Sequence, residues 1–151
     1  MHKSTKTYGH HEGLSCVFRQ PNADHSHCSL LHGYALSFRF VFGCHELDER
    51  NWVVDFGGLK ELKQWLKDSF DHKTVLDTAD PKKELIEALV PEGIAEIVYF
   101  DGVGCEKFAE HALKKADEIV QRITGGRCYC MSCEVSEHGA NSAIFIREDF
   151  D

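Results

Sequence analysis

The chain has 151 residues, of which 42% are hydrophobic and 28% are charged. This length and this balance predict one folded domain and exclude a fibrous repeat or a disordered tail. Lys and Arg number 17 against 25 Asp and Glu, and the resulting net charge of −8 repels phosphate backbones, so no nucleic-acid partner is expected.

Seven cysteines and ten histidines are the unusual part of the composition. An odd cysteine count fits a disulfide framework poorly, and residues 1–11 lack the apolar segment of a signal peptide. No apolar run approaches the ~20 residues that span a bilayer. We therefore expect a cytoplasmic protein without a membrane partner, whose reduced cysteines and histidines serve metal binding, catalysis or packing.

Strands and helices alternate along the predicted chain. Helical spacing of apolar residues predicts two amphipathic helices, at 59–68 and 106–123. Four segments are rich in β-branched and aromatic residues and predict strands, at 14–20, 35–42, 127–136 and 142–147. The first two strands can pair as an antiparallel hairpin. Residues 77–103 have a less clear role and are treated as an insertion.

This order, ββααββ, predicts an α+β fold in which two helices cover one face of a four-stranded antiparallel sheet. The whole chain, 1–151, forms one domain that contains the insertion at about 77–103. Such a sheet leaves its edge strands exposed, and pairing with neighbouring subunits is one remedy. We therefore expect a homo-oligomer.

The first candidate site lies in residues 24–34, where three histidines and one cysteine fall within eight positions just before a strand. Imidazole and thiolate are ligands that zinc prefers. A thiol close to a metal or a charged imidazole, such as that of Cys28, loses its proton more easily and becomes a base or nucleophile. A solvated polar loop is the plainer interpretation of any single histidine here.

Two further positions carry acid–base groups. Asp71 stands beside His72 at the end of the first predicted helix, where it can set the tautomer of the ring and raise its basicity for proton transfer. Glu137 lies at a strand end, where a carboxylate can accept two hydrogen bonds from a guanidine-like edge. For Glu137 alone, an exposed turn residue is the plainer interpretation.

Four ordered motifs resemble the 6-pyruvoyl-tetrahydropterin synthase and 6-carboxy-5,6,7,8-tetrahydropterin synthase family. They are Cys28-Ser29-Leu30-Leu31-His32-Gly33-Tyr34, Val54-Asp55-Phe56, Phe70-Asp71-His72 and Glu137. The family pattern is Cys-x-x-x-His-Gly-His, an Asp-Phe before the first helix, an Asp-His at its end and a final Glu. The resemblance covers most of the chain. It implies the tunnelling fold (T-fold) and hexamers built from trimers, with sites at subunit interfaces.

The resemblance also implies a function and residue roles. Cys28 abstracts a proton, Asp71 and His72 move one opposite it, and Glu137 and Glu106 hold the pterin. The implied enzyme is a lyase of queuosine biosynthesis, 6-carboxy-5,6,7,8-tetrahydropterin synthase. It converts 7,8-dihydroneopterin triphosphate into 6-carboxytetrahydropterin, acetaldehyde and triphosphate. The alternatives are a related pterin lyase or epimerase and a pterin-binding protein without catalysis. Candidate bases for neutralising the triphosphate are Arg19, Arg39 and Lys73.

The metal site departs from the family pattern, in which three histidines bind zinc. Tyr34 stands where the second histidine of His-Gly-His is expected. One alignment of the first strand places Phe18, which has no donor atom, at the remaining ligand position. A second alignment places His10 or His11 there.

A rebuilt metal site is therefore predicted from His32, His27 and His10, with His25 competing with His27. The expected cofactor is a divalent metal, zinc first. A phenolate ligand from Tyr34 would suit iron or manganese better.

The remaining cysteines are expected to pack in the core, because free cysteine is among the most buried residue types. Strand alternation predicts that Cys128 and Cys130 face one way and Cys133 the other, so a shared metal would need a bulge. Cys16, Cys44 and Cys105 are assigned to packing as well.

Overall fold

The computed structural model describes residues 1–148, so the last three residues of the predicted domain lie outside the described part. The strands are β1 His2–Tyr8, β2 Leu14–Phe18, β3 His32–Cys44, β4 Lys73–Asp77, β5 Ile97–Phe100, β6 Cys128–His138 and β7 Asn141–Ile146. The helices are α1 Lys60–Phe70, α2 Lys83–Glu87 and α3 Cys105–Ile123. Short 3₁₀ turns lie at His10–Glu12, His27–Ser29 and Phe56–Leu59.

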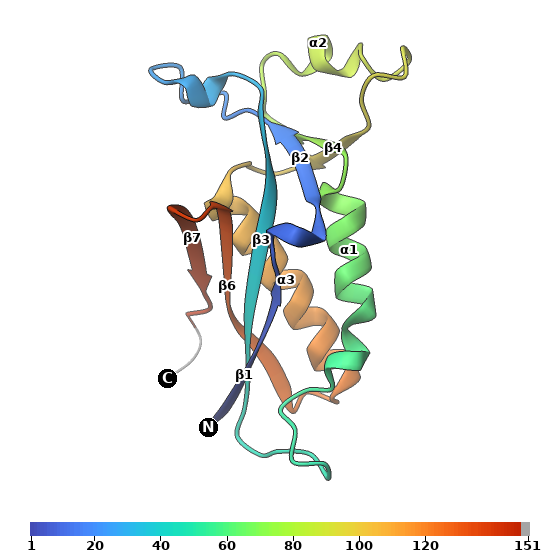
Figure 1. Ribbon diagram of the computed structural model, residues 1–151, viewed down its shortest axis with the longest axis vertical. Helices are drawn as coiled ribbons and strands as arrows, with labels where there is room; N and C mark the ends of the chain where they lie inside the picture. The colour runs from blue at the N-terminus through green and yellow to red at the C-terminus, as the bar shows by residue number, and fades with distance from the viewer. Residues whose placement is uncertain (149–151) are drawn as a thin grey trace.

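The strands form one sheet in the order β5-β4-β2-β3-β6-β7, and β1 also pairs with β3. The long strand β3 organises this sheet (Figure 1). Its first half pairs with β2 and its second half with β1, while β6 runs along its other edge. Pairing is antiparallel throughout except at β2–β4 and β4–β5, which are parallel.

The prediction of a four-stranded antiparallel sheet is therefore wrong, because the sheet is mixed and has three more strands. β1 was missed since its sequence, HKSTKTY, is polar and most of its side chains are not buried. β4 follows directly on α1 and has only five residues. β5 belongs to the segment 77–103, which thereby contributes to the sheet as well as forming α2.

The two long helices lie together on one face of the sheet, as predicted (Figure 1). The apolar stripe of α3 includes Phe108, Ala112 and Ile119, all fully buried, and α1 buries Leu62 and Leu66 in the same core. The spacing of three and four residues puts these side chains on one side of each helix. None of the helices within residues 1–148 combines the length and apolar character that crossing a bilayer requires.

The cysteines of β6 all enter this core. A bulge opposite Val41 and Phe42 gives β6 one extra residue, so Cys133 faces the same side as Cys128 and Cys130. The prediction that Cys133 faces the other way is thus wrong, since simple alternation fails across a bulge. Packing is confirmed, because all three side chains are fully buried, and Cys16, Cys44 and Cys105 are buried too.

Candidate functional site

The β2–β3 hairpin positions the first residues of the site. His32 lies directly across from Phe18, and Tyr34 across from Cys16, so all four side chains are on the face that carries the core. Between them, a Cβ at Gly33 would come within 2.8 Å of the carbonyl oxygen of Cys16. The glycine of the His-Gly motif is therefore required by the close approach of the two strands.

Glu137 is the centre of a polar cluster at this end of the sheet. Its carboxylate lies near the Tyr34 hydroxyl and the Cys105 thiol, and its charge and hydrogen bonding contribute to the raised pKa of both groups. Burial, followed by the charge of Glu137, raises the pKa of Tyr34. Burial and the same carboxylate raise the pKa of Cys105 to about 12. Both groups are thus protonated donors at neutral pH.

Cys105 and Tyr34 were missed as neighbours of Glu137. Cys105 was assigned to packing, and Tyr34 was considered only as a changed metal ligand. The available signal was the position of Cys105 directly before Glu106, at the first turn of α3. Glu106 itself is exposed there, close enough for its charge to act on Cys105.

Cys28 lies in the 3₁₀ turn His27–Ser29 and is exposed. The Ser26 hydroxyl oxygen accepts a hydrogen bond from the Cys28 backbone N–H at 3.1 Å, which fixes the start of this turn. The thiol is near enough to influence Tyr34 electrostatically. Cys28 and Glu137 both act electrostatically on Tyr34, and Glu137 and Glu106 both act on Cys105.

Asp71 and His72 lie elsewhere on the chain surface. The His72 Nδ1 is 2.6 Å from Asp71 Oδ1, and the His72 side chain is 88% exposed. The His72 backbone N–H donates to the Ser15 carbonyl at 2.7 Å, and the ring borders a depression that Ser15 and Val17 also line. These two β2 side chains face away from the core, so the dyad sits on the sheet face opposite Tyr34.

The predicted metal ligands are not gathered in one place. His10 Nδ1 lies 2.5 Å from the Ala35 carbonyl oxygen, and His27 is in the exposed loop before β3. Residues 1–148 contain no group of three or more His, Cys, Asp or Glu side chains arranged to hold a metal ion. In the alignment that puts Phe18 across from His32 at a ligand position, only His32 carries an imidazole, so that set of side chains does not fit zinc. The rebuilt zinc site stays a prediction.

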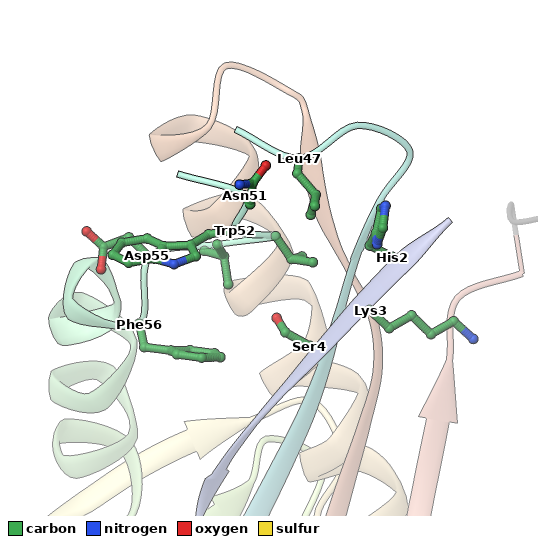
Figure 2. A pocket seen from close by; sticks show the side chains of 10 residues that line it. His2, Lys3, Ser4, Leu47, Asn51, Trp52, Asp55 and Phe56 are labelled. Atoms are coloured by element: carbon green, nitrogen blue, oxygen red, sulfur yellow. The ribbon is translucent and has the colours of Figure 1, made fainter. Parts of the chain in front are cut away.

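A cavity of about 470 Å³ lies at the other end of β3. It opens between β1 and residues 47–56, and its walls include the half-exposed rings of Trp52 and Phe56 (Figure 2). The Asp55-Phe56 motif therefore lines this cavity. No catalytic, pterin-binding or metal residue predicted from the sequence is among its described lining residues.

Solved structures with the same fold define the class of the protein. An uncharacterized protein, WS1659, from Wolinella succinogenes superimposes with a TM-score of 0.78, covering 97% of this chain and 98% of that one at 18% identity. A 6-pyruvoyl tetrahydropterin synthase from Plasmodium falciparum gives a TM-score of 0.66, covering 96% and 98% at 14% identity. The chain is thus an α+β protein with the T-fold.

Residues 9–148 match the family described as 6-pyruvoyl tetrahydropterin synthase, and the chain belongs to that family.

A curated relative is similar over a shorter stretch. The 6-carboxy-5,6,7,8-tetrahydropterin synthase of Rickettsia conorii is 33% identical over 54 residues. That match covers 35% of this chain and 39% of the length of the relative. The family resemblance drawn from the four motifs is confirmed, while the reaction of this chain does not follow from so partial a match.

Proposed function

We propose that this protein is a 6-carboxy-5,6,7,8-tetrahydropterin synthase. In this reaction, 7,8-dihydroneopterin triphosphate and water yield 6-carboxytetrahydropterin, acetaldehyde and triphosphate, a step of queuosine biosynthesis. The observation that carries the proposal is that the Glu137 carboxylate and the exposed thiol of Cys28 both lie within electrostatic reach of Tyr34, near one end of the sheet. The name of the partial relative from Rickettsia conorii supports the same choice.

Each gathered group has a task in this chemistry. The Glu137 carboxylate can accept hydrogen bonds from the amino group and ring N–H of the pterin, since a charged oxygen is a strong acceptor. Glu106 adds a second carboxylate at the start of α3. Cys28, which is exposed, can then remove a proton from the substrate side chain.

A second copy of the chain is proposed to complete the site. The His72 ring is largely exposed and borders the depression on the outer face of β2, so the Asp71–His72 dyad can serve a neighbour's site. Three strands, β1, β5 and β7, also have one edge without a partner among the described strands. Such edges can pair between subunits, in keeping with the trimer-based hexamer expected from the resemblance.

Binding and turnover should be measured for Glu137→Gln, which keeps the size of the side chain but removes its charge. Pterin binding is expected to weaken by roughly 10–100-fold, because hydrogen bonds to a charged group are lost. The matched control is Glu134→Gln, on the same strand, whose carboxylate accepts a hydrogen bond from Ser142 instead.

The zinc prediction, with iron or manganese as alternatives, is tested by running each assay after chelation and again with each metal. No turnover under any of these conditions would refute the synthase.

Complementation tests the shared site. Cys28→Ala and His72→Ala chains, each inactive alone, should regain part of the activity when they are refolded together, because some sites then receive both intact groups. Absence of recovery in mixed oligomers would contradict a site shared between chains.

Pterin binding without catalysis is the competing function. A chain that binds a pterin in a Glu137-dependent manner but turns over no substrate would establish it, and an epimerase would leave the carbon chain of the substrate intact. Product analysis by mass spectrometry separates all three, since only the synthase releases acetaldehyde.

A further inference from the structure

Three ring side chains form a triangle at the strand end beside Glu137. Phe18 and His32 face each other across the β2–β3 hairpin, with ring centroids 4.8 Å apart. Tyr34 follows on β3, with its ring centroid 5.5 Å from that of His32 and 6.2 Å from that of Phe18. In the alignment that places Phe18 at the first-strand ligand position, these are the positions at which the family pattern has its three histidine ligands.

The size of the triangle corresponds to a three-imidazole metal centre. Zinc binds an imidazole nitrogen at about 2.0–2.1 Å, which places the ion about 3.2 Å from the centre of each ring. With tetrahedral angles at the ion, the ring centres lie about 5.2 Å from one another. The observed separations of 4.8, 5.5 and 6.2 Å span this value. The backbone sets this arrangement, because Phe18 pairs directly with His32 and Tyr34 follows two residues later on the same face.

The side chains do not supply the matching donors. His32 is oriented as a ligand would be, since its Nδ1 lies 2.7 Å from the Leu30 carbonyl oxygen and leaves Nε2 for another partner. Phe18 has no donor atom and is fully buried. Tyr34 offers a phenol oxygen, which is not among the usual ligands of zinc.

We propose that residues 18, 32 and 34 form a zinc-sized cradle that has lost two of its three donors. The natural chain then does not hold zinc at these positions, and the substitutions Phe18→His and Tyr34→His together restore the ion. Metal content is the readout, so a failure of the proposed synthase activity leaves this inference untouched, and the reverse also holds.

The F18H/Y34H chain is expected to retain one Zn²⁺ per chain after dialysis against metal-free buffer. Bound Co²⁺ should give the visible absorption of a tetrahedral site. The matched control, F18L/Y34F, adds no donor and should retain no more zinc than the natural chain. Adding His32→Ala to the double variant should abolish its zinc.

Two results would overturn the inference. One is an F18H/Y34H chain with native far-UV circular dichroism that binds no more zinc than the natural chain. The other is a natural chain that retains one equivalent of zinc which His32→Ala removes. Because Phe18 is fully buried, Tyr34→His alone gives a second test at a half-buried position. It should tighten zinc binding on the order of 10–100-fold, and an unchanged affinity would count against the cradle.

Discussion

Raising the pH from 8 to 10 should destabilise the folded chain steeply, because its buried thiols cannot ionise. Burial raises the pKa of Cys16 to about 12 and, together with the Glu137 charge, that of Cys105 to about 12. Burial and Cys44 raise the pKa of Cys128 to about 11, and burial raises those of Cys130 and Cys133 further. In the unfolded chain, the same thiols lose their protons near the ordinary value of 9.0.

The sign of the effect follows from proton binding. A group whose pKa is higher in the folded state gives stability that is present below the unfolded pKa and is lost as the pH rises. At pH 10, ionisation of each unfolded thiol lowers the free energy of unfolding by about 1.4 kcal/mol. Five such thiols together remove roughly 7 kcal/mol, which is comparable with the entire 5–15 kcal/mol of a typical domain.

Urea unfolding at pH 8, 9 and 10, with a reductant present, measures this loss. Cys133→Ala removes one buried thiol and should reduce the loss between pH 8 and pH 10 by about 1.4 kcal/mol. Cys28→Ser is the matched control, and because Cys28 is exposed in the folded chain, it should leave the loss unchanged. If the natural chain loses less than about 1 kcal/mol by pH 10, the thiols are not shielded as their burial requires.

Three other substitutions test the site and the core. Cys28→Ala should abolish turnover while thermal melting stays unchanged, since the side chain is exposed; retained activity would remove Cys28 from the mechanism. Arg19→Met should cost about 3–5 kcal/mol of stability because it leaves the fully buried Asp80 without its partner at 2.5 Å, and adding Asp80→Asn should recover most of this loss. Phe108→Ala should cost about 3–5 kcal/mol in urea unfolding, because its ring packs against Phe18 and Phe70 at centroid separations of 5.1 and 5.2 Å; a cost below 1 kcal/mol would contradict that packing.

The parts of the fold that carry a strong periodic pattern could be predicted from the sequence. The apolar stripe of α3 predicted a helix at 106–123, and the helix begins one residue earlier, at Cys105. Burial of one helix face requires apolar residues at helical spacing, so this pattern is visible in the sequence. β1 could not be found in this way, since its side chains face largely outward and its pairing with β3 supplies the stabilisation. Parallel pairing of β4 and β5 is a tertiary property that short segments do not display.

The candidate site shows the same division. Cys28, Asp71, His72 and Glu137 could be proposed as site residues because their types and order match a motif. The neighbours of Glu137 were not found, because Cys105 reaches it only through the packing of α3 on the sheet. The orientation of Cys133 depended on a bulge, and a bulge changes the side-chain alternation on which the prediction rested.

The charge distribution gives a separate argument for a neighbouring chain at the site. Arg19, one of the bases considered for the triphosphate, is bound to the buried Asp80, and releasing it would leave that carboxylate unpaired. The Lys73 Nζ lies 2.7 Å from the Glu96 Oε2 in an ion pair. Arg39 projects from the outer face of β3, directly across from Glu134. With a net charge of −8 and these bases facing carboxylates, one chain provides little positive potential for a triphosphate. We therefore propose that a second copy of the chain supplies cations for the triphosphate, just as it is proposed to supply the Asp71–His72 dyad for the acid–base chemistry.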